Sequence, residues 1–239
     1  MKELWRREIR MNAQQVSNNI YQMSTIGALM SGLYDECISL SKLKENGDLG
    51  LGTFKGLDGE LTLLDGNFYR TNPDGSICLC DESVTAPFAM VTKFNDYKEF
   101  TIKDCCNFKE LIKRLNKLIE SKNIFYAFSI EGEFKYVKTR NVVKQEKPYK
   151  PFTEVVKNQP VFEYVNIKGN MVGFRCPEYV DGLSVPSYHF HFISADKKIG
   201  GHVVECGIDL IKIKIQKCSC FRMELPQNST FYKMDLSFT

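Results

Sequence analysis

The histidines of this chain are confined to one short stretch, and that confinement constrains the fold more than any other feature. His189 and His191 form an H-x-H pair, and His202 follows a Gly-Gly dipeptide after a polar segment. In a β-strand, residues two apart point to the same face, so both imidazoles of the pair face the same way. The polar segment suits a tight turn, and the pattern therefore predicts a β-hairpin.

The register of this hairpin decides whether the third imidazole joins the pair. A symmetric turn centred between Asp196 and Lys197 places His191 directly opposite His202, with β-carbons roughly 5 Å apart, and makes the other histidine a diagonal neighbour. A bulge at Gly200-Gly201 would instead turn His202 to the other face. The alternate residues are apolar and are predicted to pack into a core: Phe190, Phe192 and Val203.

Three neutral imidazoles on one face of a hairpin can hold a Zn²⁺ ion of the catalytic kind, with positions left open for substrate. Zinc is a preference, since other first-row metals take the same ligands. The competing interpretation is a set of surface or partly satisfied histidines. No serine nucleophile elbow occurs, and no histidine remains to act as a triad base. Acid–base chemistry therefore falls to carboxylates, tyrosine or metal-bound water.

The composition is that of an ordinary globular protein with a sizeable core. The 239 residues suffice for one large or two small domains, and the net charge of +3 is too mild to favour nucleic acid as a partner. No apolar run approaches the roughly 20 residues of a membrane span. The charged N-terminal residues lack the apolar region of a signal peptide.

Nine cysteines occur in the chain without any C-x-x-C spacing. We interpret them as buried, reduced thiols that act as small hydrophobic groups. Reduced thiols favour the cytoplasm as the compartment. A structural zinc site made by cysteines is the alternative.

Short apolar segments separated by turn residues predict many strands and few helices. The expected class is α/β in the broad sense, an α+β protein with mostly antiparallel or mixed sheets. The clearest helix is predicted over Phe108–Ser121 with Asp104 as its cap, and Ser24-Thr25 is expected to cap another helix. A hairpin is predicted across Glu131-Gly132-Glu133. Further expected elements are helices around Cys37–Leu43 and Thr153–Lys157, strands over Val161–Ile167 and Met171–Phe174, and a last strand near Phe231–Leu236.

Motifs outside the hairpin fall into the order of a known family. The specific part is the paired F-H-x-H and G-G-H spacing within Val185–Ile193 and Gly200–Val203, to which Lys55–Glu60 (KGLDGE), Leu64-Asp65-Gly66 and Tyr69 add weaker matches. Together these segments resemble the bacterial alpha-acetolactate decarboxylase family, and the resemblance extends over roughly residues 20 to 236. Shorter matches are Ile20-Tyr21-Gln22, Gly27-x-Leu29-Met30-x-Gly32, Gly132-x-Phe134-Lys135, Arg140 and Gln159-Pro160.

The resemblance implies an open-barrel fold of two sheet-containing lobes and a homodimer. From the charged N-terminal residues and the proline-containing connector 144–152, we expect an N-terminal arm over residues 1–15, a first sheet lobe over 16–147 and a second lobe over 148–239 that carries the histidine hairpin. The family's three zinc ligands match His189, His191 and His202. Its glutamate after Asp-Gly matches Glu60, its arginine at a strand end matches Arg140, and a pocket residue matches Thr53.

The reaction that the resemblance implies is the decarboxylation of 2-acetolactate (2-hydroxy-2-methyl-3-oxobutanoate) to acetoin, a step of the butanediol pathway. Zinc would act as the electron sink, Arg140 would orient the substrate, and Glu60 would relay the proton. The expected protein is a cytoplasmic carboxy-lyase that acts on a small molecule, without nucleic-acid or membrane partners.

One departure from the family concerns its carboxylate-rich tail, whose glutamate reaches back to the metal. The printed residues stop at Asp235-Leu236-Ser237-Phe238-Thr239. The expectations are a lost tail with reduced activity, or partial substitution by Glu224 or Asp235. Two alternatives stay open: a metal-binding homologue that has lost turnover, and another three-histidine metalloenzyme such as a cupin-like isomerase or a hydrolase.

Overall fold

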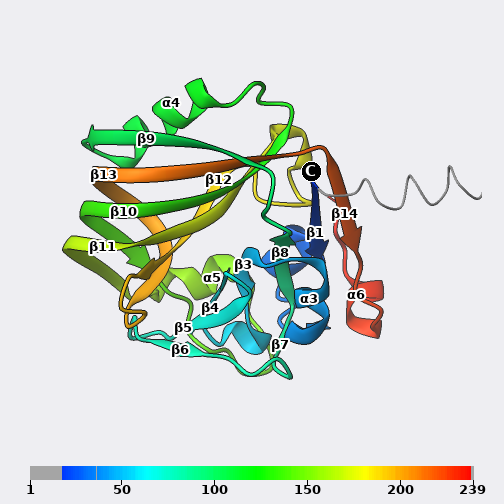
Figure 1. The fold of residues 1–239 in the computed structure, drawn as a ribbon. Coiled ribbons are helices and arrows are strands. Elements are labelled where there is room, and N and C mark those ends of the chain that lie inside the picture. The colour runs from blue at the N-terminus through cyan, green and yellow to red at the C-terminus, as the bar shows by residue number, and fades with distance from the viewer. Residues whose placement is uncertain (1–17, 36, 238–239) are drawn as a thin grey trace, which may run out of the picture.

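Two large β-sheets carry most of the chain (Figure 1). The computed structural model describes residues 18–35 and 37–237, and the arm expected over residues 1–15 lies outside them. The helices are short and lie beside the sheets. The expected α+β class is therefore confirmed.

The first sheet has seven strands, most of them from the first half of the chain. Its β1–β14 pair is parallel, and the other pairs that the structure describes in it are antiparallel. A small separate sheet pairs β2 (Ile38–Ser39) with β7 (Thr85–Ala86). The order of the large sheet is β14 (Cys220–Glu224), β1 (Asn19–Met23), β8 (Phe88–Thr92), β3 (Leu49–Thr53), β4 (Glu60–Leu64), β5 (Asn67–Thr71) and β6 (Ile77–Leu79).

The second sheet closes on itself. Its order is β10 (Phe125–Arg140), β11 (Val161–Cys176), β12 (Ser187–Ser194), β13 (Gly200–Cys218) and β9 (Tyr97–Cys105), and β10 also pairs with β13. The four strands β10 to β13 thus form a ring of paired strands. Pairing of β12 with β13 covers only His191–Ile193 against Gly200–His202, so the ring is open over most of that seam. This ring has the barrel character that the resemblance implies.

Aromatic and aliphatic side chains fill the ring and join it to the helix above it. Phe128, Phe134, Phe190 and Phe192 are almost completely buried there. Helix α4 (Phe108–Leu118) packs Leu111 and Leu115 onto the same cluster. The prediction that Phe190, Phe192 and Val203 belong to a core is confirmed.

A second buried cluster joins the two sheets. Leu51 and Met90 from the seven-stranded sheet lie in one cluster with Ala127, Val172 and Phe174 from the ring. The strands β3, β4 and β8 are buried along their full length, because a further cluster that includes residues of α3 (Leu40–Asn46) covers their other face. Burial of this apolar surface fixes β4 against the histidine strand β12, which contacts it.

The hairpin predicted across Glu131-Gly132-Glu133 is wrong. The strand β10 runs without interruption from Phe125 to Arg140, with Gly132 paired to both neighbouring strands. A β-carbon on Gly132 would lie 2.1 Å from the Leu210 carbonyl oxygen. The glycine therefore serves the close approach of two strands and not a turn. The two strands predicted over 161–174 are likewise the single strand β11.

Several element ends also differ from the predictions. The N-cap of α4 is Asn107, whose Oδ1 accepts from the Glu110 N–H at 2.9 Å, and not Asp104. The cap predicted at Ser24-Thr25 is confirmed for Thr25. The remaining helical elements are α2 (Ile26–Met30), α5 (Phe152–Val155), α6 (Ser229–Lys233), and the 3₁₀ turns η1 (Lys55–Leu57), η2 (Val156–Asn158) and η3 (Glu178–Val180). The strand predicted near 231–236 is therefore wrong, and the helix predicted over 37–43 is β2 followed by α3.

Strand pairing crosses the expected lobe boundary near residue 147. The strands β9 and β10 precede the boundary but belong to the second sheet, and β14 follows it but pairs with β1 in the first sheet. The division into lobes 16–147 and 148–239 stays a prediction.

The cysteines divide between interior and surface. The interpretation as buried thiols is right for Cys105, Cys176, Cys206 and Cys218. It is wrong for three exposed cysteines: Cys78, Cys106 and Cys220.

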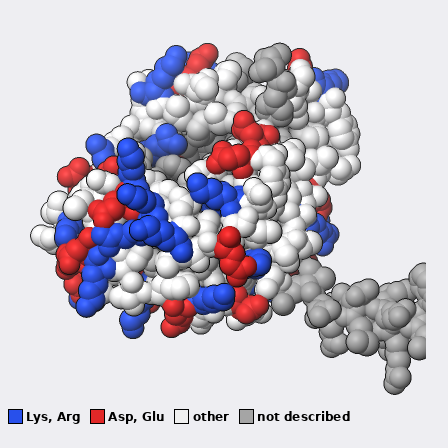
Figure 2. All heavy atoms as spheres, turned by 90° about the horizontal axis from the view of Figure 1, so that it is seen from above, with Lys and Arg blue, Asp and Glu red and all other residues white. Residues whose placement is uncertain are grey.

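Charged side chains of both signs are intermingled over the face seen in Figure 2. Exposed ion pairs such as Lys217–Glu120 contribute little to stability because water and salt screen them. Among the described residues, every helix is too short or too polar to cross a membrane.

The close approach of β11 and β12 at Gly173 yields a test of this packing. A β-carbon there would lie 2.1 Å from the His189 carbonyl oxygen. We expect Gly173→Ala to lower the free energy of unfolding by about 3 kcal/mol, at the upper end of overpacking costs, in chemical denaturation. The control is Gly66→Ala, since a β-carbon on Gly66 meets nothing within 4 Å. In Gly66→Ala only the positive φ of residue 66 is unfavourable, so we expect that variant to lose roughly 1 kcal/mol of its free energy of unfolding. Equal losses in both variants would contradict the packing described.

Candidate metal centre

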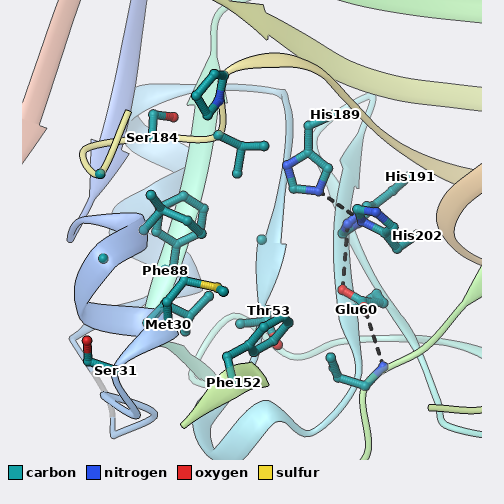
Figure 3. Close-up of a pocket in the computed structure, with 18 of the residues that line it drawn as sticks. Met30, Ser31, Thr53, Glu60, Phe88, Phe152, Ser184, His189, His191 and His202 are labelled. Carbon is teal, nitrogen blue, oxygen red and sulfur yellow. Dashed lines mark hydrogen bonds and ion pairs between the residues drawn. The ribbon is translucent and has the colours of Figure 1, made fainter. Parts of the chain in front are cut away.

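The three histidines converge on one face of the ring. His191 and His202 are direct cross-strand partners, so the symmetric register predicted from the sequence is confirmed and the pairing stays regular through Gly200-Gly201. The ring centroid of His189 lies 5.2 Å from the ring centroid of His191 and 4.8 Å from that of His202. One ligand nitrogen from each residue lies within 4.8 Å of the others, and Figure 3 shows the three rings gathered at one end of a pocket.

The three imidazoles are neutral at pH 7. Burial lowers the pKa of His191 to about 4, against the opposing effect of its hydrogen bond to Leu61. Burial also holds the pKa values of His189 and His202 well below their usual range, and neighbouring histidines and Arg140 act in the same direction. Each ring therefore keeps a lone pair for a ligand.

The orientation of His191 is fixed by the seven-stranded sheet. Its Nδ1 lies 2.8 Å from the Leu61 carbonyl oxygen. Because a carbonyl only accepts, Nδ1 carries the proton and donates it. The lone pair is then on Nε2, which lies 3.6 Å from Glu60 Oε2. A backbone partner on one nitrogen that frees the other is the usual arrangement of a metal-ligating histidine.

The spacing of the other two rings fits a shared ion. His189 Nε2 lies 3.1 Å from His202 Nδ1. Two nitrogens at about 2.0–2.1 Å from a tetrahedral zinc ion are about 3.3 Å apart, which is close to this distance. Among the described residues, His189 Nδ1 is buried without a hydrogen-bond partner, so the polar contact of that ring is made by Nε2, toward His202. The residues therefore fit a bound zinc ion.

Glu60 is the first residue of β4, and its side chain reaches into the same site. It is 6% exposed, and its Oε1 accepts from the Val142 N–H at 3.2 Å. Burial raises the pKa of Glu60 to about 7, although the Val142 hydrogen bond and Arg140 act to lower it. A substantial fraction of the carboxyl is therefore protonated at neutral pH.

Thr53 stands opposite Glu60 in the β3–β4 pair. Its hydroxyl donates to the Gly59 carbonyl oxygen at 2.9 Å, and Thr53 also lines the pocket. The contact supports the turn that leads into Glu60.

Arg140 ends β10 directly opposite His202, with its Nη2 3.4 Å from His202 Nε2. A register shift between Lys138 and Thr139 produces this pairing, because Val204 is an extra residue on β13. Without the shift Arg140 would stand opposite Val203. The bulge thus turns the guanidinium toward the histidines.

Asn141 is a buried residue beside the site, between two residues that line the pocket, and the sequence did not indicate it. Its Nδ2 donates to the Asn72 carbonyl oxygen and its backbone N–H to the Pro160 carbonyl oxygen, each at 3.2 Å. A β-carbon on Gly201 would lie 2.1 Å from Asn141 Oδ1, so the glycine before His202 makes room for it. The neighbours of Asn141 are Arg140 and Val142, and its contacts hold the segment that carries both.

The pocket around these residues encloses about 440 Å³. All six site residues that the resemblance implies line this pocket: Thr53, Glu60, Arg140, His189, His191 and His202. The suggested substitutes for a tail carboxylate do not line it. Glu224 accepts from Tyr21 and Lys42, and Asp235 accepts from Ser237.

The raised pKa of Glu60 predicts a pH-dependent effect of its replacement. The folded-state pKa lies above the unfolded value, so the ionised carboxyl destabilises the fold as the pH rises through about 7. We expect Glu60→Gln to stabilise the metal-free protein by about 2–3 kcal/mol more at pH 8 than at pH 4.5, measured by denaturation with a chelator present. A stability difference that is the same at both pH values would contradict the burial assigned to Glu60.

Several known proteins are similar to this chain over most of its length. The family model described as alpha-acetolactate decarboxylase matches residues 20–238. An alpha-acetolactate decarboxylase from Methanosarcina mazei is 44% identical over 92% of this chain and 78% of the relative. One from Bacillus licheniformis is 36% identical over 99% of this chain and 94% of its own length. The crystal structure of alpha-acetolactate decarboxylase from Bacillus subtilis matches with a TM-score of 0.90 at 38% identity, covering 92% of this chain and 94% of that one.

Proposed function

Because the chain belongs to the alpha-acetolactate decarboxylase family and is accordingly a decarboxylase, we propose that it converts 2-acetolactate to acetoin and CO₂ at a zinc ion held by His189, His191 and His202. The observation that carries the zinc assignment is the convergence of three neutral imidazoles beside a buried carboxyl. The family membership supplies the substrate.

A bound Zn²⁺ would supply a Lewis acid that polarises the keto group and favours uptake of the electron pair released as CO₂ leaves. Loss of CO₂ breaks the C1–C2 bond of the substrate, and its electron pair moves into an enolate across C2 and C3. One proton added at C2 then gives the hydroxyketone. The protein has to bind the carboxylate, exclude water and deliver that proton.

Arg140 is suited to bind the substrate carboxylate. Its guanidinium lies at the polar end of the pocket and opposite His202. A planar guanidinium can hold a carboxylate through two parallel hydrogen bonds, which fixes orientation as well as position. This contact would hold the C1–C2 bond in one orientation near the histidines.

Glu60 is suited to deliver the proton. Burial raises its pKa to about 7, so the carboxyl can carry a proton at neutral pH and release it within the site. The Val142 N–H on Oε1 holds the group in place. Thr53, whose hydroxyl supports the preceding turn, is proposed as a substrate-binding residue of the same wall.

We also propose that the chain forms homodimers, as the family resemblance implies, that it works in the cytoplasm, and that it divides into lobes 16–147 and 148–239. Light scattering of the purified protein tests the first of these, with the mass of two chains as the expected result and that of one chain as the contradiction.

The zinc assignment predicts that metal and activity are lost together. We expect His189→Ala to lose bound zinc and to release no acetoin from racemic 2-acetolactate, because two ligands of the pocket do not retain the ion. The wild type should lose activity with a chelator and regain it with Zn²⁺. Lys198→Ala, in the turn of the same hairpin, is the control and should keep both. Full activity in a metal-free His189→Ala protein would refute the proposal.

The role of Glu60 predicts a loss in turnover more than in binding. Glu60→Gln keeps the shape and an acceptor for the Val142 N–H but has no acidic proton. We expect kcat to fall by about 10²–10⁴-fold, with KM changed only slightly. Glu163→Gln, an exposed change on β11, should have no effect. An unchanged kcat in Glu60→Gln would remove Glu60 from the proton transfer.

A further inference from the structure

The pocket has two chemically different ends. Its polar end holds the three histidines with Glu60 and Arg140. Its other end is formed by α2, β8, α5 and the segment after η3, and Figure 3 shows Met30 and Phe88 on the side away from the histidines. The apolar residues that line this end are Ile26, Leu29, Met30, Phe88, Phe152, Val185 and Pro186.

Most of the apolar end is a fixed wall. Leu29 and Phe88 belong to the buried cluster between the two sheets, and Phe152 packs against that cluster. Helix α2 contacts α5, which places Met30 and Phe152 on neighbouring elements. Met30 differs from the others because it is 36% exposed. A flexible thioether side chain at the rim can move aside or fill space.

The proposed substrate uses only part of this pocket. Its carboxylate, hydroxyl and keto groups sit on adjacent carbons, so all of them engage the polar end, and only short alkyl groups remain to face the apolar wall. A volume of about 440 Å³ lies in the range of pockets that hold drug-sized ligands, whereas 2-acetolactate has five carbons. With a methyl group on C2, much of the apolar end stays in contact with water.

We propose that the site also decarboxylates 2-hydroxy-3-oxo acids with a propyl or butyl group on C2, and that Met30 and Phe152 set the upper size of that group. This inference rests on the proposed function. The reaction is the same: the C1–C2 bond breaks, CO₂ leaves with its oxygen atoms unchanged, and one proton added at C2 gives the longer hydroxyketone. The added methylenes exchange water for the wall of the pocket.

The first test compares 2-hydroxy-3-oxobutanoates that carry methyl, propyl or butyl on C2, with the zinc-loaded wild-type protein. Because each buried methylene favours binding, we expect KM to fall by up to about fourfold per methylene, with kcat/KM for the propyl substrate at or above that for methyl. A fall of more than tenfold in kcat/KM would overturn the inference. If the methyl substrate is converted and the longer ones are not, only this inference fails. If no substrate releases CO₂, the proposed function fails.

Two variants test the named residues. Met30→Trp adds bulk at the rim and should lower kcat/KM for the butyl substrate at least tenfold more than for the methyl substrate. Phe152→Ala removes an aromatic ring from the wall and thereby enlarges the pocket, so it should shift the substrate preference toward butyl. Met234→Trp, at a half-buried methionine after α6 that does not line the pocket, is the matched control and should leave the ratio unchanged. Equal effects of Met30→Trp on both substrates, or an unchanged preference in Phe152→Ala, would overturn the assignment of these residues.

Discussion

The pairing of β13 with a strand on each side is the constraint on which the rest of the site depends. His202 stands opposite His191 on β12 and opposite Arg140 on β10. Two imidazoles and one guanidinium are thereby aligned across three strands by the backbone pairing. A slip of one residue in either pairing would turn one partner to the opposite face. The extra residue Val204 supplies the register on the β10 side, and it leaves an apolar side chain 43% exposed.

Burial then acts in opposite directions on acids and bases within the same pocket. It lowers the pKa of the histidines and raises the pKa of Glu60, because both changes avoid an unpaired charge in a dry environment. The imidazoles are free to bind a cation, and the carboxyl can carry a proton. The packing of the two sheets against each other provides this burial, since Leu61 and Glu60 come from one sheet and the histidines from the other. The packing of the two sheets therefore both stabilises the fold and shifts the pKa values of the site.

The histidine hairpin could be predicted from the sequence because its signals are local. Period-two alternation and a symmetric polar turn suffice to place His191 opposite His202, and the structure agrees. Glu60 and Arg140 could be named only through the family resemblance, since each reaches the site through a sheet contact far away in the chain. Asn141 gave no signal, because a buried asparagine is recognised by its partners and not by its neighbours in sequence. Gly132 was misread as a turn residue because close approach of two strands and a tight turn both demand glycine.

The central claim is that the three histidines hold the metal on which the decarboxylation depends. Anomalous diffraction at the zinc absorption edge from crystals of the zinc-incubated protein tests it most directly. The account predicts one strong anomalous peak per chain, bonded to one nitrogen of each of His189, His191 and His202 at about 2.0–2.1 Å. A peak bound elsewhere, for instance at exposed cysteines, with none among the three imidazoles, would contradict it.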